Sequence, residues 1–196
     1  MVAMAPTAGP DPARSIATLG PDGFRRDIHS LVAIYLAAMD YPREIAPQRT
    51  ALWVEHSRRV GFDARVARDA DGDPIGLAYG YRGAPGQWWF SEIARGLGST
   101  TAPVLHDFFE LTELHIRPDH QGHGLGESLL RSLAAPRPER RMLLSTPEGE
   151  NRAWRLYRRL GFTDVLRHYR FTGDARPFGI LGRELPLAVA DGAAGH

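Results

Sequence analysis

Apolar side chains recur at helical spacing in several parts of the chain. In the segment 25–41, Ile28, Leu31 and Ile34 fall on one face of a helix, which Pro42 ends. Further helices are predicted at 47–61, 123–135 and 151–161, with a short helical insert within 86–108.

Other segments alternate apolar and polar residues, which is the pattern of half-buried strands. Within 64–82 two such segments flank Asp71 and Gly72, so this region is predicted to be a hairpin. The remaining strands are predicted at 109–116, 140–146, 162–171 and 178–187. This order indicates one mixed α/β domain whose central unit is strand, loop, helix, strand, helix.

Composition divides the chain into a domain and two tails. Residues 1–24 and 188–196 are rich in Pro, Gly and Ala, so we expect tails without regular structure on either side of a single domain over 25–187. The first residues lack the basic and apolar regions of a secretory signal, so a cytoplasmic protein is expected.

Charge and residue usage exclude several kinds of chemistry. The 24 basic and 23 acidic residues nearly balance, so nothing favours a nucleic acid or a membrane surface as a partner. Every basic residue is arginine, which excludes a P-loop lysine and a Schiff-base lysine. Cysteine is absent, which excludes disulfides, cysteine nucleophiles and thiolate metal sites. No histidine and carboxylate group has metal-ligand spacing, so we expect no metal.

A glycine-rich loop joins the strand that ends near residue 116 to the helix that follows it. Glycines at 122, 124 and 126 allow positive φ and leave no Cβ over the backbone, so several N–H groups can face one concavity. The N-terminal amides of the helix add to them, a combination that binds phosphate. A structural turn with no ligand remains an alternative. The dinucleotide fingerprint would need glycine at position 127, where this chain has Glu127.

Two motifs resemble the GNAT superfamily of N-acetyltransferases. The stretch IRPDHQGHGLGESLL resembles the family's cofactor-loop motif, with Gln121, Gly124 and Gly126 on the signature positions. The stretch NRAWRLYRRLGF resembles the second motif through Asn151, Ala153, Leu156, Tyr157, Gly161 and Phe162. The two motifs stand in the expected order, and with the order of elements the resemblance covers about residues 25–187.

The resemblance implies a fold and a co-substrate. A GNAT fold has a central, mostly antiparallel sheet with helices on both faces, and two central strands splay apart to form the cofactor cleft. Members transfer an acetyl group from acetyl-CoA to an amine, with the pantetheine arm laid against the strand before the loop. The residues implied to bind CoA are Leu114, His115, Ile116, Arg117, Gln121, Gly122, His123, Gly124, Leu125, Gly126, Glu127, Asn151 and Arg158. Asn151 is equally suited to cap the helix after it.

Three residues are candidates for moving protons. Glu110 stands at the register of the glutamate base in the histone-acetylating branch of the family, and Tyr157 matches the tyrosine that protonates the leaving thiolate in many members. Glu113 is a second candidate base, but its odd spacing from Glu110 predicts the opposite strand face unless a bulge intervenes. A water chain could replace either base, and both glutamates could simply pair with nearby arginines.

The acceptor is predicted only as a class, a small-molecule or peptide amine. Aromatic candidates for its pocket are Tyr35, Tyr41, Trp53, Trp88, Trp89 and Phe109, and acidic candidates are Asp40, Glu44, Glu92 and Asp107. With no cysteine, direct attack of the amine in a ternary complex is expected. A non-catalytic acyl-CoA-binding or sensing domain is the alternative. Family members are often dimers, so a homodimer is an option.

Overall fold

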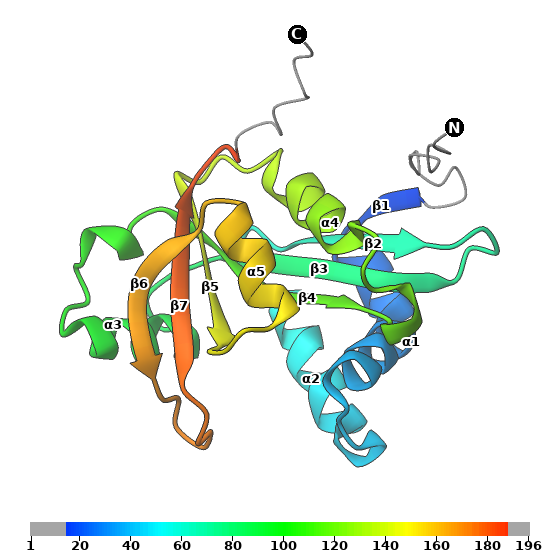
Figure 1. Cartoon of the computed structure of the whole chain (residues 1–196), viewed down its shortest axis with the longest axis horizontal. Helices are drawn as coiled ribbons and strands as arrows, with labels where there is room; N and C mark the ends of the chain where they lie inside the picture. Colours follow the sequence, from blue (N-terminus) through cyan, green and yellow to red (C-terminus); the bar gives the residue numbers. More distant parts are fainter. Residues whose placement is uncertain (1–14, 188–196) are drawn as a thin grey trace, which may run out of the picture.

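A seven-stranded sheet runs through residues 15–187, the part of the chain that the computed structural model describes (Figure 1). The strands are β1 (Ser15–Leu19), β2 (Asp63–Arg68), β3 (Pro74–Arg82), β4 (Phe108–Ile116), β5 (Arg141–Pro147), β6 (Thr163–Tyr169) and β7 (Phe178–Glu184). The helices are α1 (Pro21–Met39), α2 (Ala46–His56), α3 (Trp88–Leu97), α4 (Leu125–Ala134) and α5 (Arg152–Arg159). The strand order is β1-β2-β3-β4-β5-β7-β6.

The sheet separates between β4 and β5. All other neighbours are antiparallel, whereas β4 and β5 are parallel and pair only from Phe108↔Arg141 to Glu110↔Leu143. In Figure 1, β2 and β3 run across the view while β6 and β7 run nearly upright, which shows how strongly the two halves diverge. The predicted fold class, a mostly antiparallel mixed sheet with two splayed central strands, is confirmed.

A bulge in β4 changes which side chains share a face. Tyr79 pairs with Glu113 and Gly80 with Leu111, so Thr112 is an extra residue in the ladder. Because Glu110 and Glu113 lie opposite Tyr81 and Tyr79, which are two residues apart, both carboxylates face the same side of the sheet. Odd spacing alone predicted opposite faces, which is wrong here, because the bulge that was named as the exception is present.

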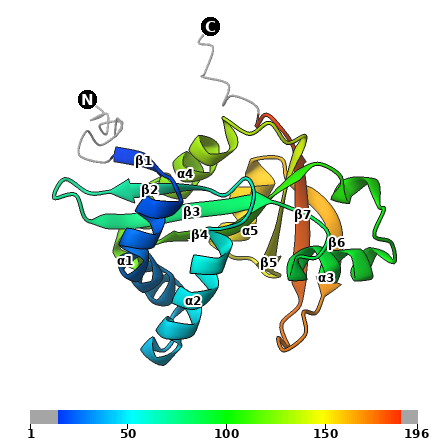
Figure 2. The same ribbon diagram turned by 180° about the vertical axis from the view of Figure 1, so that it is seen from behind.

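Helices cover both faces, and each group packs its own core. On one face α4 and α5 enclose a cluster that includes Leu129, Leu130 and Tyr157. On the other face α1 and α2 pack over β2 and β3, and α3 covers the β5–β7 end (Figure 2). None of the described helices is both long and apolar enough to cross a membrane.

The N-terminal boundary of the domain lies earlier than predicted. Residues 15–24, assigned to the tail, form β1 and the start of α1, and Phe24 is fully buried against Trp53. β1 is a five-residue, half-exposed edge strand paired only with β2, so its own pattern is too short to identify it. The assigned tail residues 1–14 and 188–196 lie outside the described residues.

Candidate active site

A cavity of about 1220 Å³ passes through the sheet where β4 and β5 separate. At one end it is lined by the glycine loop and α5, and at the other by α1, α2 and the loop 171–176 between β6 and β7. The middle is lined by β4 and by Ser145 and Thr146 of β5. The cavity therefore joins the two faces of the sheet. We call its two ends the loop end and the α2 end.

The loop end is built from glycine backbone. Gly122 and Gly124 have φ values of +91° and +76°, and a Cβ on either would meet no atom within 4 Å, so the space in front of them is open. Within residues 15–187, no N–H from Gly122 to Glu127 donates a hydrogen bond to another backbone group outside the helix ladder, and α4 begins at Leu125. Free amides at a helix N-terminus suit a pyrophosphate.

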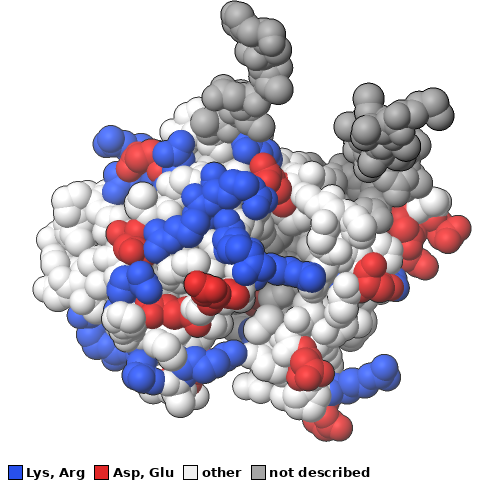
Figure 3. Space-filling model, viewed as in Figure 1, with Lys and Arg blue, Asp and Glu red and all other residues white. Residues whose placement is uncertain are grey.

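Side chains brace this loop from both sides. Gln121 Nε2 donates to Ile116 O at 3.0 Å, and Arg152 Nη1 donates to Gln121 Oε1 at 2.8 Å. Arg159 and Arg131 both bind the Glu127 carboxylate, which lowers its pKa. Figure 3 shows arginine side chains gathered over the middle of the face that carries α4 and α5. The loop end is thus held in place and basic.

Most of the residues implied to bind CoA line the cavity. They are Leu114, His115, Ile116, Gln121, Gly122, Gly124, Leu125, Gly126, Glu127 and Asn151. Asn151 also caps α5, because its Oδ1 accepts from Trp154 N at 2.8 Å. Beyond Glu110, the edge of β4 that faces β5 has no strand partner among the described residues, so an extended chain could lie along it.

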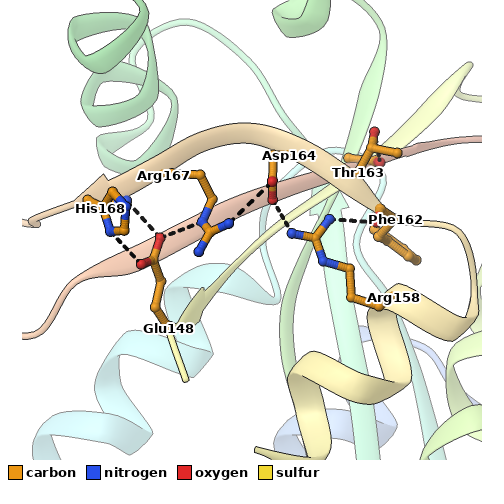
Figure 4. A network of polar contacts seen from close by, with 8 residues as sticks. Glu148, Arg158, Phe162, Thr163, Asp164, Arg167 and His168 are labelled. Atoms are coloured by element: carbon orange, nitrogen blue, oxygen red, sulfur yellow. Dashed lines mark hydrogen bonds and ion pairs between the residues drawn. The ribbon is translucent and has the colours of Figure 1, made fainter. Parts of the chain in front are cut away.

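Arg117, His123 and Arg158 do not line the cavity. Arg117 Nη2 donates to Asp119 Oδ2 at 2.7 Å. Arg158 pairs with Asp164 and donates to Phe162 O at 3.2 Å, on the side of α5 turned towards β6 (Figure 4). The prediction that Arg158 contacts CoA is not supported by this placement, since its ion pair draws it away. Arg152, Arg155 and Arg159 line the cavity instead.

Glu110 is buried at the point where β4 and β5 part. Only 3% of the residue is exposed, and Tyr81 donates its hydroxyl proton to Oε1 at 3.1 Å. Oε2 has no hydrogen-bond partner among the described residues. Burial raises the pKa of the carboxyl to about 8, against the opposing effects of the Tyr81 hydrogen bond and the Arg59 charge. At neutral pH the carboxyl is therefore mostly protonated.

Glu113 belongs to a polar group on the same face. His115 Nε2 lies 2.6 Å from Glu113 Oε2, and Arg49 Nη1 lies 3.6 Å from Oε1. Arg49 in turn donates to Tyr35 Oη at 2.6 Å, and the ring of Tyr35 meets that of His115 edge-on. Glu113 is thus the partner of an arginine, as one of the alternatives held, whereas no ion pair joins Glu110 to a described arginine.

Tyr157 faces the cavity from α5. It is 7% exposed, and its ring packs on Phe162 at 5.6 Å between centroids. Burial, and then the charge of Glu113, raise the pKa of its phenol well above the ordinary value, so the hydroxyl keeps its proton at neutral pH. No hydrogen bond links this hydroxyl to any residue of the described range 15–187.

The α2 end contains residues that the sequence did not single out, namely His56, Arg59, Arg49, Tyr81 and Arg176. His56 and Arg59 come from the end of α2, and their sequence VEHSRRVGF gives no sign of a site. Among the aromatic acceptor candidates, Tyr35, Tyr41, Trp88 and Trp89 line the cavity, whereas Trp53 and Phe109 are in the core. None of the four acidic candidates lines it.

Among residues 15–187, no three His, Asp or Glu side chains are grouped so that they could hold a metal ion.

Comparisons with known proteins point to one family. Residues 66–164 match the family model described as an acetyltransferase (GNAT) domain. The chain is 45% identical over 199 residues to a GCN5-like protein acetyltransferase of Mycobacterium tuberculosis, covering 86% of this chain and 97% of that protein.

Solved structures share the fold. The ribosomal-protein-S18-alanine N-acetyltransferase of Escherichia coli matches with a TM-score of 0.62 at 18% identity, over 93% of this chain and 99% of its own. The yncA protein of Salmonella typhimurium, solved with its cofactor acetyl-CoA, matches with a TM-score of 0.60 at 20% identity, over 93% and 99%.

Proposed function

Because this chain belongs to the GNAT family and is an acetyl-CoA-dependent acetyltransferase, we propose that it transfers the acetyl group directly to a primary amine. The observation that carries this proposal is the single cavity that joins the glycine loop on one face of the sheet to the carboxyl groups of β4 on the other. A donor bound at the loop end and an amine entering from the α2 end would meet where β4 and β5 part.

The loop end fits the co-substrate. The free N–H groups from Gly122 to Glu127 would hold the pyrophosphate, and the unpaired edge of β4 would hold the pantetheine amides. Bound there, acetyl-CoA supplies the activated thioester carbonyl. The bulge at Thr112 turns the local backbone of β4, a device that re-aims groups beside active sites.

Glu110 is proposed as the base. A substrate ammonium, with an ordinary pKa near ~10, must lose a proton before it can attack. Glu110 lines the cavity, its Oε2 is buried and has no hydrogen-bond partner among the described residues, and Tyr81 fixes the orientation of the carboxyl through Oε1. A bound ammonium would favour the carboxylate form and lower the pKa of the carboxyl.

Tyr157 is proposed as the acid that protonates the leaving thiolate. Its phenol is protonated at neutral pH and lies across the cavity from β4, within electrostatic reach of Glu113. The chain has no cysteine, so an acetyl-cysteine intermediate is not available and the amine would attack directly.

The pH dependence of the reaction tests the base. The acceptor is a short peptide with an acetylated N-terminus and one lysine, whose amine has an ordinary pKa of ~10.4 and so does not titrate near pH 8. The release of CoA thiol gives the rate, from which kcat/KM is obtained at each pH. Because the carboxyl titrates at about pH 8, kcat/KM should rise through that pH. Glu110→Gln should lower the rate by about 10²–10⁴-fold and remove this rise. Glu113→Gln is the matched control and should keep the rise. If the rise survives in Glu110→Gln and disappears in Glu113→Gln, Glu113 is the base.

A further inference from the structure

The α2 end of the cavity carries hydrogen-bond donors as well as the carboxyl groups of β4. His56 is the last residue of α2, and Arg59 follows three residues later. Both line the cavity, as do Glu110 and Glu113 of β4. We call His56 and Arg59 the donor pair. Neither is proposed above to move a proton, and Arg59 acts on Glu110 only through its charge.

The environment of His56 fixes which ring nitrogen carries the proton. The Tyr79 hydroxyl is completely buried and lies 3.0 Å from His56 Nδ1. Within residues 15–187 it has no other partner, and a buried hydroxyl proton needs an acceptor, so Tyr79 donates to Nδ1. Burial and the Arg59 charge lower the pKa of His56 to about 4, so the ring is neutral at pH 7. Its single proton is then on Nε2, which becomes a donor towards the cavity.

Arg59 carries a charge that no ion pair with a described residue neutralises. Of the arginines at the α2 end, Arg49 pairs with Glu113 and Arg176 with Asp174. Arg59 has no ion pair with any described residue, and its guanidinium stacks 4.4 Å from the ring centroid of Tyr81. Tyr81 thus contacts both Arg59, through its ring, and Glu110, through its hydroxyl. A half-buried guanidinium aimed at a cavity is well suited to an anion.

We propose that the donor pair binds a carboxylate that the acceptor carries beside its reactive amine. This inference rests on the proposed transfer to an amine and adds the substrate class. The amine would lie against β4, where the acceptor groups are, and the carboxylate would lie against α2, where the donors are. The reactive nitrogen is then directed to Glu110 by groups of opposite character that line the same cavity.

Such a carboxylate has two sources, a free amino acid or an acidic residue next to the acetylated lysine of a peptide. Two matched pairs of acceptors separate them. One pair is L-phenylalanine and phenylalaninamide, and the other is a lysine peptide with glutamate or with glutamine beside the lysine. In at least one pair, the acceptor with the carboxylate should have a kcat/KM higher by about ten- to a hundredfold, mainly through KM.

The variant Arg59→Gln tests the assigned residue. The half-buried side chain makes no ion pair within the described structure, so the substitution should leave the fold intact, which acetyl-CoA binding checks. It should reduce the ratio of kcat/KM between the acceptor with the carboxylate and its matched partner to about one-tenth or less of the wild-type ratio. Arg58→Gln is the matched control, because Arg58 is an exposed neighbour that pairs with Glu55 and does not line the cavity. It should leave the preference and the rate unchanged.

The outcomes separate this inference from the transfer itself. Equal rates within both pairs, or a preference that survives in Arg59→Gln, would overturn the inference and leave the transfer standing. Turnover of none of the four acceptors by a protein that binds acetyl-CoA would also overturn it. Failure to bind acetyl-CoA would instead contradict the proposed function. A preference in one pair only would identify the source of the carboxylate.

Discussion

Glu110 and Tyr157 both hold a proton at neutral pH for the same reason, because each is buried in the wall of the cavity. For Tyr157 this is the state an acid needs. For Glu110 it is a resting state, since the carboxyl must lose its proton before it can accept one from the amine. The same burial that raises its pKa would make an arriving ammonium a strong partner, because charges interact more strongly away from water.

Tyr157→Phe tests the acid. The ring is retained and the hydroxyl has no hydrogen-bond partner within residues 15–187, so stability and acetyl-CoA binding should change little. The transfer rate should fall by about 10²-fold or more. Tyr169→Phe is the control, since its hydroxyl donates to Glu92 O at 2.8 Å outside the cavity and its loss should lower the melting temperature, not the rate. An unchanged rate in Tyr157→Phe would contradict the assignment.

For single residues, the sequence identified which side chains are candidates for the chemistry, but it did not predict how they are placed relative to one another. Glu110, Glu113 and Tyr157 were all candidates, but the bulge at Thr112 decided that the two glutamates share a face. Whether a strand has a bulge depends on the strand it pairs with. Here β3 and β4 approach so closely that a Cβ on Gly80 would lie 2.0 Å from Glu110 O. The alternation of apolar and polar residues within β4 does not reveal this contact. His56 and Arg59 were missed because they reach the cavity only through the packing of α2 on β3 and β4.

A polar network ties α5 to the sheet edge. Glu148, in the loop before α5, accepts from Arg167 Nε at 2.8 Å and from the backbone N of His168 at 2.7 Å (Figure 4). His168 has a φ of +55°, a conformation that L-residues adopt at a cost, and the carboxylate holds it there. Arg158 and Arg167 lie on the ring of Trp154 at 4.8 and 4.9 Å. Through these contacts Arg158 stabilises the packing of α5 on β6.

Glu148→Gln should destabilise the protein in a pH-dependent way. The Arg167 hydrogen bond, followed by the His168 amide, lowers the pKa of Glu148 from 4.5 to about 2. A lowered folded-state pKa means that the carboxylate stabilises the fold above pH 4.5 and loses this effect as the pH falls towards 2.

Urea unfolding measures that effect. Glu148→Gln should lose about 1–3 kcal/mol at pH 7, and the difference from the wild type should shrink below pH 4.5. Glu150→Gln, a change at an exposed neighbour, should be neutral at both pH values. A difference that does not vary with pH would mean that the carboxylate charge is not what stabilises this region.

Helices and strands with an extended apolar pattern were predicted, whereas the short edge strand β1 was not. The hairpin of β2 and β3 and the helices α2, α4 and α5 were predicted because their apolar spacing extends over several turns or alternations, although α2 ends at His56 and not at the predicted residue 61. The weaker pattern within 86–108 predicted the short helix α3. β1 was missed because five residues with one neighbouring strand carry too little pattern. α1 begins at Pro21 rather than in the predicted 25–41 segment, and a proline in the first turn was the signal that could have placed its start.

On the scale of the whole molecule, the site exists because the sheet separates. Three residue pairs join β4 to β5 and so connect the two halves of the sheet. Beyond these pairs, the cavity connects the face covered by α4 and α5 with the face covered by α1 and α2 (Figures 1 and 2). Donor and acceptor can therefore enter from opposite faces. Neither face alone carries both the glycine loop and the carboxyl groups.

The most direct test of this account is isothermal titration of acetyl-CoA into the wild type, Gly124→Ala and Gly72→Ala. Both glycines have positive φ and open space in front of them, so both substitutions carry a similar backbone cost of about 1–2 kcal/mol. Only Gly124 faces the cavity. We predict binding by the wild type and Gly72→Ala, and binding weakened by at least about tenfold in Gly124→Ala. No binding by the wild type, or equal affinity in the two variants, would contradict the account.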